Sequence, residues 1–318
     1  MNLSPYVHIL GRGPGRSRGL TSTEAREAMR IMLSGGADPE AVGAILMLLR
    51  MKGETADEIA GFATTVQASL GPLPPVDLDW PSYAAGRSRG LPWFLMSAKL
   101  VALSGHRVLM HGWNGADPAV RAGLTIAGIP VAKSIGAAAK DLDRGAITYL
   151  PLEILSPPLL ALLRLRDVLG LRSCINTVAR MLNPAGAPAS VQGVFHPAYR
   201  SLQADAARLL RWSSLTVIKG GGGEFERNPA KPATCLGLRA GTPWQAVSPA
   251  SFTWARPSGD EPKDPARLRR LWQGTSEDPF SEQVVLRTAE LALDTLGVTE
   301  PRALAQDLWS GRTRSRAA

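Results

Sequence analysis

The helical part of the fold is decided by residues 21–70, which read TSTEAREAMRIMLSGGADPEAVGAILMLLRMKGETADEIAGFATTVQASL. The tetrads 21–24 and 55–58 each begin with threonine and end with glutamate, which is the spacing of a capping box at a helix start. Between them, Asp38 and Pro39 have the residue types typical of an N-cap and a first helical position. Apolar residues follow each start at helical spacing. The stretch therefore predicts three short helices that pack as one unit.

Beyond this unit the pattern of the chain changes. Residues 71–81 contain four prolines and predict a linker. After it, short apolar runs alternate with helical patterns. The expected strands are 107–111, 146–150, 191–195 and 215–218. Because such alternation is typical of a mainly parallel sheet, we expect an α/β domain over 82–318 and a helical domain over 1–72. We also expect part of 156–185 to pack on the helical domain.

The composition excludes several classes of protein. Hydrophobic residues make up 45% of the 318 residues, which excludes wholesale disorder, and no apolar run is long enough for a membrane span. Cys174 and Cys235 are too few for a disulfide scaffold and are expected to be buried thiols. The N-terminus is too short and too mixed for a secretory signal. We therefore expect a cytoplasmic protein with no membrane partner.

The chain carries a surplus of cations. Lys and Arg number 36 against 27 Asp and Glu, which gives a net charge of +9, and 29 of the cations are Arg. A guanidinium suits phosphate and stacks on nucleic-acid bases. The surplus therefore favours polyanionic partners such as nucleic acid or phosphorylated ligands. Codon bias explains the ratio of Arg to Lys but not the net excess.

Two basic, glycine-rich segments have the composition of phosphate-binding loops. Residues 11–19 precede the first capping box and are either such a loop or a solvated connector. Residues 81–90 lie ahead of an expected helix, where two bulky arginines favour an extended phosphate backbone over a compact diphosphate. The candidate phosphate contacts here are Arg12, Arg16, Arg18, Gly86, Arg87, Ser88 and Arg89.

A strand end and a third glycine-rich segment give further candidates. His111 at the strand end is either structural or a phosphate contact, and Trp113 is either a base-stacking group or a core residue. In the later segment, four consecutive glycines expose backbone amides to an anion, or form a surface loop. The candidate phosphate contacts there are Lys219, Gly221, Gly222 and Arg227.

The same segment contains two carboxylates. Glu224 and Glu226 are a weak magnesium pair because no third ligand accompanies them, so we expect no metal site. The sequence contains no Walker P-loop, no Cys/His cluster with zinc spacing and no G-x-S-x-G elbow. We therefore assign no catalytic residue and no cofactor, and Mg²⁺ enters only if the chain is an enzyme.

Residues 46–55 (LMLLRMKGET) and 58–62 (EIAGF) resemble the N-terminal helical signature of the anthranilate phosphoribosyltransferases, in glycosyl transferase family 3. Pyrimidine-nucleoside phosphorylases share this signature. Later landmarks fit in the same order, so the resemblance spans nearly the whole chain. These landmarks are Gly86, His111-Gly112, Arg172 to Asn176, Asn183-Pro184 and Gly220. The resemblance implies an active site between a small helical and a large α/β domain, and a homodimer joined through the helical domain.

The chain departs from the enzymes at several motifs. The enzymes bind the diphosphate of phosphoribosyl pyrophosphate with a glycine-threonine-glycine-glycine-aspartate turn, where this chain has AGRSRG at 85–90. Of the enzymes' Lys-His-Gly-Asn motif, this chain retains only His111-Gly112. Of their Mg²⁺-binding Asp-Glu pair, it retains only Glu226. Arg172 and Asn176 do match the enzyme pattern Arg-x-x-x-Asn, and we count them among the phosphate contacts.

These departures predict loss of the enzyme activity, because the charge of a departing diphosphate needs Mg²⁺ and preorganised donors. They are similar to a non-enzymatic branch of the family, the DNA-binding YbiB-like proteins. We therefore predict a homodimer that binds single-stranded DNA, duplex DNA or RNA without sequence preference, along the former active-site groove. One alternative is an active phosphoribosyltransferase or nucleoside phosphorylase with an altered substrate, in which Glu224 and Glu226 bind Mg²⁺. Another is a structural dimer that binds a protein.

Overall fold

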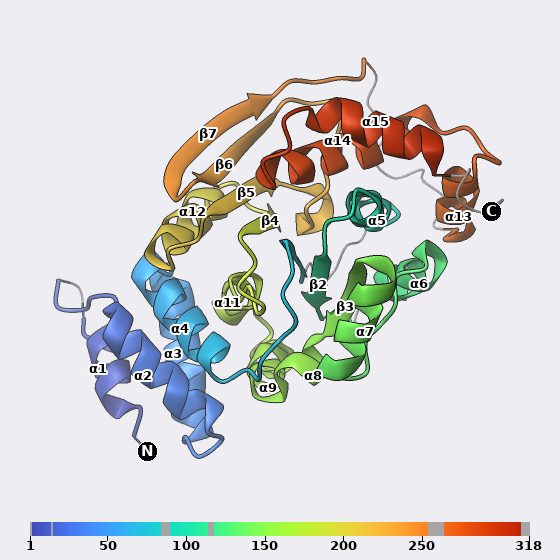
Figure 1. Ribbon diagram of the computed structural model, residues 1–318. Helices are drawn as coiled ribbons and strands as arrows, with labels where there is room; N and C mark the ends of the chain where they lie inside the picture. The colour runs from blue at the N-terminus through green and yellow to red at the C-terminus, as the bar shows by residue number, and fades with distance from the viewer. Residues whose placement is uncertain (1, 14, 84–89, 114–117, 254–263, 313–318) are drawn as a thin grey trace.

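The computed structural model describes residues 2–13, 15–83, 90–113, 118–253 and 264–312 (Figure 1). The chain begins with a group of four helices, which Figure 1 shows in blue. Their bounds are Ser4–Gly11 for α1, Ser22–Leu33 for α2, Pro39–Lys52 for α3 and Ala56–Ala68 for α4.

The starts of α2, α3 and α4 follow the sequence pattern, whereas α1 was not among the three expected helices and begins without a side-chain cap. Both expected capping boxes are confirmed: Thr21 pairs with Glu24 ahead of α2, and Thr55 pairs with Glu58 ahead of α4. Helix α3 begins at Pro39 as expected, although the side chain of the preceding aspartate makes no capping hydrogen bond. Helices α2 and α4 pack closely.

Seven strands of the described chain form one sheet in the order β3-β2-β1-β4-β5-β6-β7. Strands β1 to β5 are parallel, and β6 and β7 are antiparallel additions at one edge. The expected α/β fold with a mainly parallel sheet is thus confirmed. The strands are Leu78–Ser82 (β1), Val108–Gly112 (β2), Ile147–Pro151 (β3), Ala189–Val194 (β4), Ser214–Lys219 (β5), Ala233–Arg239 (β6) and Thr242–Ser248 (β7).

Helices cover both faces of this sheet. They are α5 (Phe94–Leu103), α6 (Pro118–Ala127), α7 (Ile135–Gly145), α8 (Leu152–Leu155), α9 (Pro157–Arg164), α10 (Arg166–Leu169), α11 (Ile175–Arg180), α12 (Tyr199–Leu209), α13 (Ala266–Gln273), α14 (Pro279–Thr295) and α15 (Pro301–Gly311). A 3₁₀ turn, η1, spans Gly221–Gly223. Among the described residues, no helix is both long and apolar enough to cross a membrane.

Two hydrophobic clusters lie on the two faces of the sheet. Along β2, Leu109 belongs to one cluster and Met110 to the other, because successive strand residues point to opposite faces. The first cluster joins α1–α4 to α9, α11 and α12, and the second lies under α5, α14 and α15. Helix α4 packs on α11 and α12, and α9 contacts α2. The N-terminal helices are therefore fixed against the α/β part, and both cysteines are buried.

The central strand β1 differs from the sequence expectation. Residues 78–81 lie inside the segment expected to be a linker, yet they pair with β2 on one side and β4 on the other. The prolines misled the interpretation, since Pro81 has no N–H for a sheet and reads as a break. It is tolerated one residue from the end of the strand, where the fully buried Trp80 is the main apolar anchor.

Candidate functional site

A cavity of about 520 Å³ opens beside the carboxyl ends of β4 and β5. The strand order reverses between β1 and β4, and ligands of open parallel sheets bind outside the carboxyl ends of the strands at such a point. The lining comes from segments far apart in the chain: Arg50, Glu54, Gly170, Leu171, Arg172, Ser173, Asn176, Thr177, Arg180, Val194, Phe195, His196, Tyr199, Gln203 and Gly222. A larger cavity of about 880 Å³ is lined by α5, α13 and α15 and lies away from these strand ends.

Cations dominate one wall of the 520 Å³ cavity. Arg50, near the end of α3, donates a hydrogen bond from Nη1 to the carbonyl oxygen of Arg172, at 2.5 Å. Burial, followed by the charges of Arg166 and Arg50, lowers the pKa of Arg172. This wall therefore holds guanidinium groups close enough to repel one another, which favours an anionic ligand.

Opposite charges are few in the lining. The hydroxyl of Tyr199 donates to Oε2 of Glu54 at 3.2 Å. Burial raises the pKa of the Glu54 carboxyl, and burial and the charge of Glu54 raise that of the Tyr199 hydroxyl. Among the described residues of the lining, Glu54 carries the only carboxyl group, and this group is therefore less readily ionised than usual.

Two side-chain oxygens in the lining lack a hydrogen-bond donor. Oδ1 of Asn176 and Oε1 of Gln203 are buried and accept no hydrogen bond from the described residues. Buried polar atoms nearly always have a partner, and an unpaired one is costly. An N–H or O–H group of a bound molecule would satisfy them.

The glycine-rich turn closes the cavity at the end of β5. Its N–H groups are largely used internally, because Gly220 donates to Val194, Gly221 to Glu226 and Gly223 to Gly220. The expectation that these glycines present free amides to an anion is therefore wrong for most of the turn. They are needed for close approach instead: a Cβ on Gly220 would lie 1.6 Å from the carbonyl oxygen of Glu224.

The two carboxylates of this turn are buried and hydrogen-bonded. The hydroxyl of Ser82 donates to Glu224 Oε1, and the N–H of Phe94, the first residue of α5, donates to Glu226 Oε2, both at 3.0 Å. Glu226 thus places its charge at a helix N-terminus, where an anion is favourable. No group of three His, Cys, Asp or Glu among the described residues is arranged to hold a metal ion. These residues by themselves do not fit a Mg²⁺ site.

His111 takes part in a closed network inside the sheet. Its Nε2 lies 3.0 Å from Asp79 Oδ1, its Nδ1 lies 2.9 Å from the Tyr83 hydroxyl, and all three side chains are buried. The second carboxylate oxygen of Asp79 accepts from Ser190 at 2.7 Å. These contacts favour the structural interpretation of His111. Trp113 is half-buried against the first hydrophobic cluster, which favours its interpretation as a core residue.

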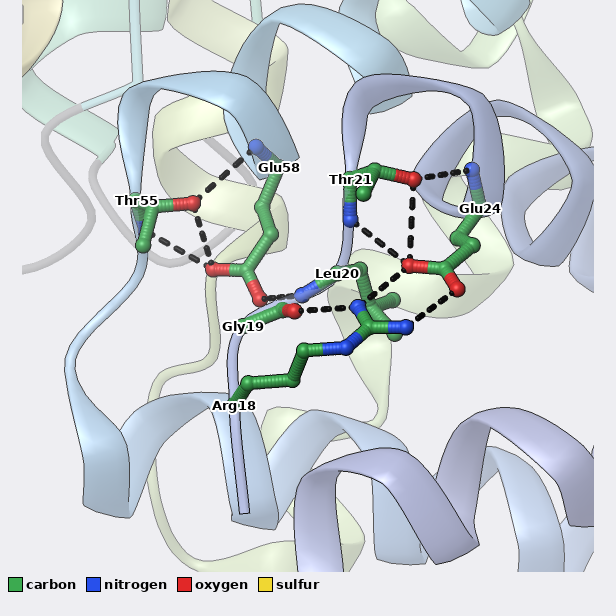
Figure 2. Close-up of polar contacts among 7 residues, drawn as sticks. All are labelled: Arg18, Gly19, Leu20, Thr21, Glu24, Thr55 and Glu58. Carbon is green, nitrogen blue, oxygen red and sulfur yellow. Dashed lines mark hydrogen bonds and ion pairs between the residues drawn. The ribbon is translucent and has the colours of Figure 1, made fainter. Parts of the chain in front are cut away.

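Most of the other expected phosphate contacts lie outside the cavity. Arg18 forms a two-pronged ion pair with Glu24 of the α2 capping box, with both N···O distances 2.6 Å, and the N–H of Leu20 links this segment to Glu58 of the α4 capping box (Figure 2). Arg12 donates to His8 at 2.8 Å. Arg227 is buried and donates to the carbonyl oxygens of Ser248 and Pro249. Arg16 and Lys219 are exposed and do not line the cavity.

Of the expected set, the cavity lining contains Arg172, Asn176 and Gly222. Gly86, Arg87, Ser88 and Arg89 lie outside the described residues. Sequence analysis missed Arg50, Glu54, Arg180, Tyr199 and Gln203. One signal was present, because Arg180 follows Asn176 by four residues and so shares its helix face. The others depend on contacts between distant segments.

Comparisons with known proteins agree with this architecture. The family described as "Glycosyl transferase family, helical bundle domain" matches residues 5–70. Anthranilate phosphoribosyltransferase 2 of Streptomyces coelicolor is 30% identical over 293 residues, which cover 88% of this chain and 87% of that protein. The anthranilate phosphoribosyltransferase of Thermus thermophilus is 28% identical over 281 residues, or 84% of this chain and 83% of the relative.

Solved structures give the same result for the fold. The crystal structure of the Thermus thermophilus anthranilate phosphoribosyltransferase superposes with a TM-score of 0.80 at 24% identity, and covers 99% of this chain and 97% of its own. The Saccharomyces cerevisiae enzyme in complex with PRPP and Mg has a TM-score of 0.77 at 18% identity, with 99% and 95% covered.

These comparisons overturn the prediction of nucleic-acid binding. The relatives and structural neighbours are enzymes named for a small aromatic acid, and none indicates binding of DNA or RNA. The physical reason for the error is that net charge counts every cation equally, whereas Arg18 and Arg227 are engaged within the protein. Nucleic acid as partner is therefore wrong too, and the relatives do not support the expected homodimer.

Proposed function

The chain belongs to the glycosyl transferase family of the anthranilate phosphoribosyltransferases, and we propose that it is an active pentosyltransferase with a small anionic acceptor. The observation that carries this proposal is the cavity at the strand reversal, where Arg172 and Asn176 come together. These two residues match the Arg-x-x-x-Asn pattern of the enzymes. The YbiB-like branch remains a prediction from sequence and contributes no activity to this proposal.

The lining suits an aromatic carboxylate as acceptor. The guanidinium of Arg172 would bind the carboxylate through charge-assisted hydrogen bonds. The unpaired oxygens of Asn176 and Gln203 would accept from an amino or hydroxyl group of the acceptor. Phe195, whose side chain is 60% exposed beside the cavity, offers an apolar ring to a planar acceptor.

For the pentosyl donor we propose phosphoribosyl pyrophosphate, which the Saccharomyces cerevisiae neighbour binds together with Mg. In such a transfer the amine nitrogen of the acceptor forms a bond to the sugar carbon while the bond from that carbon to a diphosphate oxygen breaks. The diphosphate leaves with the electron pair of the broken bond, and the amine proton is lost to solvent. The cavity residues bind and orient the acceptor for this step. Because the described residues do not fit a Mg²⁺ site by themselves, no step is assigned to the metal.

The test is a transfer assay with purified full-length protein, phosphoribosyl pyrophosphate, MgCl₂ and anthranilate. Ribosylated product and released diphosphate are quantified by chromatography. We expect both products in equal amounts. We also expect Arg172→Gln to lower kcat/KM for the acceptor by about 10- to 100-fold, since a charged hydrogen bond is lost.

The matched control is Arg164→Gln, at the exposed end of α9 and outside the cavity lining. This variant should retain the wild-type kcat/KM. Product formation that is equally affected by both substitutions would contradict the role of the cavity. No product with anthranilate or with a panel of aromatic carboxylates would contradict the proposed transfer.

A further inference from the structure

A second guanidinium faces the same cavity as Arg172. Arg180 is the last residue of α11 and belongs to the cavity lining. Its Nη1 donates to the carbonyl oxygen of Asn176, at 3.1 Å. Among the described residues no carboxylate lies within ion-pair distance of it. A guanidinium has five N–H donors, and the described residues accept only the Nη1 hydrogen bond, so Arg180 has further N–H groups that a ligand could engage.

The surroundings make this cation costly without a bound anion. Burial lowers the pKa of Arg180, the negative charge of Glu224 opposes this shift, and the positive charge of Arg172 adds to it. Arg180 is half-buried, and a partly desolvated charge with no opposite charge in contact is less favourable than one at the surface. Arg50 does not relieve the repulsion, since it is another cation bonded to the Arg172 carbonyl. A second negative group on a ligand would relieve it.

We propose that the preferred acceptor of this chain is a dianion, an aromatic amine with two carboxylates, one on Arg172 and the other on Arg180. This inference rests on the proposed function and names the class of its acceptor. The amine is inferred from the side-chain oxygens of Asn176 and Gln203, which would accept its N–H groups. The planar ring is inferred from the exposed side chain of Phe195, against which such a ring could pack. A volume of about 520 Å³ is ample for such a molecule.

Calorimetry with the full-length protein tests the number of charges directly. The probes are anthranilate, with one carboxylate, and 2-aminoterephthalate and 2-aminoisophthalate, each with two. Wild-type protein should bind at least one of the two dianions about 10-fold more tightly than anthranilate or better. Equal or weaker binding of both dianions would overturn the proposal.

Substitution of Arg180 then assigns the effect to this side chain. Arg180→Gln should weaken binding of the preferred dianion by about 10- to 100-fold and that of anthranilate by less than about 3-fold. Arg180→Lys should restore part of the dianion preference, because it keeps the charge but not the fork. Arg164→Gln is the control and should leave every Kd unchanged.

Three further outcomes are decisive. If Arg180→Gln weakens the binding of phosphoribosyl pyrophosphate and leaves the binding of the dianion unchanged, Arg180 binds the donor and the proposal fails. If Arg180→Gln does not fold, the proposal is decided by wild-type protein, whose Kd for anthranilate is compared with its Kd for each dianion. If the dianion binds through Arg180 but is not ribosylated in the presence of donor and Mg²⁺, the proposed transfer fails while the dianion site stands.

Discussion

The capping network of the N-terminal helices and the wall of the cavity use the same kinds of side chain in opposite ways. In the network, Glu58 accepts hydrogen bonds from the N–H groups of Leu20 and Thr55, and Glu24 accepts from Arg18 (Figure 2). In the wall, side-chain oxygens of Asn176 and Gln203 accept no hydrogen bond from the described residues, and Arg180 donates to a backbone carbonyl instead of a carboxylate.

The difference separates stabilising from ligand-binding polar groups. A paired group contributes to the free energy of unfolding, and its removal leaves its partner unpaired. An unpaired group beside a cavity contributes little or is unfavourable, and its removal should affect binding instead. The number of arginines does not separate stabilising from ligand-binding side chains, because Arg18 and Arg180 differ only in the groups that surround them.

The largest expected effect on stability comes from Glu58, which is almost fully buried. Glu58→Ala leaves the N–H groups of Leu20 and Thr55 without their acceptor and should lower the free energy of unfolding by about 2–4 kcal/mol. Urea denaturation measures the change. Glu27→Ala, which removes an exposed pair with Arg30, is the control and should leave the free energy of unfolding nearly unchanged. Equal losses would remove the distinction between the two regions.

Two buried asparagines provide the sharpest test of the comparison. Asn183 bonds the backbone of Ala187 through both side-chain atoms, at 2.8 and 2.9 Å, whereas Oδ1 of Asn176 is unpaired. Asn183→Ala should cost about 2–3 kcal/mol of unfolding free energy and leave acceptor binding unchanged. Asn176→Ala should cost less than about 1 kcal/mol and reduce kcat/KM for the acceptor roughly 10-fold. The reverse pattern would break the comparison.

Tyr83 extends the test to the network inside the sheet. Tyr83→Phe removes the hydroxyl that bonds Nδ1 of His111, and should cost about 1–2 kcal/mol because that nitrogen stays buried. Thermal and urea unfolding measure the loss. Tyr6→Phe, in the half-buried part of α1, is the control. A loss no larger than that of the control would exclude a stabilising role for this network.

The smallest effect is expected at Arg18, whose side chain is 53% exposed. Arg18→Met should lower the free energy of unfolding only slightly at neutral pH, because solvent screens the pair. The Arg18 hydrogen bond lowers the pKa of Glu24 from 4.5 to about 2. The stabilisation is therefore fully present above about pH 4.5 and lost as the pH falls toward 2. Urea denaturation across this range should show the unfolding free energies of the wild type and Arg18→Met converging as the pH falls. A difference that stays constant with pH would contradict the pairing.

Local sequence signals predicted the capping boxes and four strands of the sheet. A capping box is complete within four residues, and a buried strand shows as a short apolar run, so neither needs distant contacts. Strand β1 was missed because Pro81 reads as a break, and β6 and β7 were missed too. In β7 half-buried and exposed positions alternate instead of forming an apolar run.

For the candidate site, sequence supplied Arg172 and Asn176 through the family pattern, and nothing local marked their partners. Arg50 and Arg172 are 122 residues apart and meet only because the helical group packs on the α/β domain. The sequence by itself determined the starts of α2, α3 and α4, the sheet class and the family. Only the tertiary structure decided which charges are paired and which face a cavity, because pairing depends on neighbours that the folded chain brings together from distant segments.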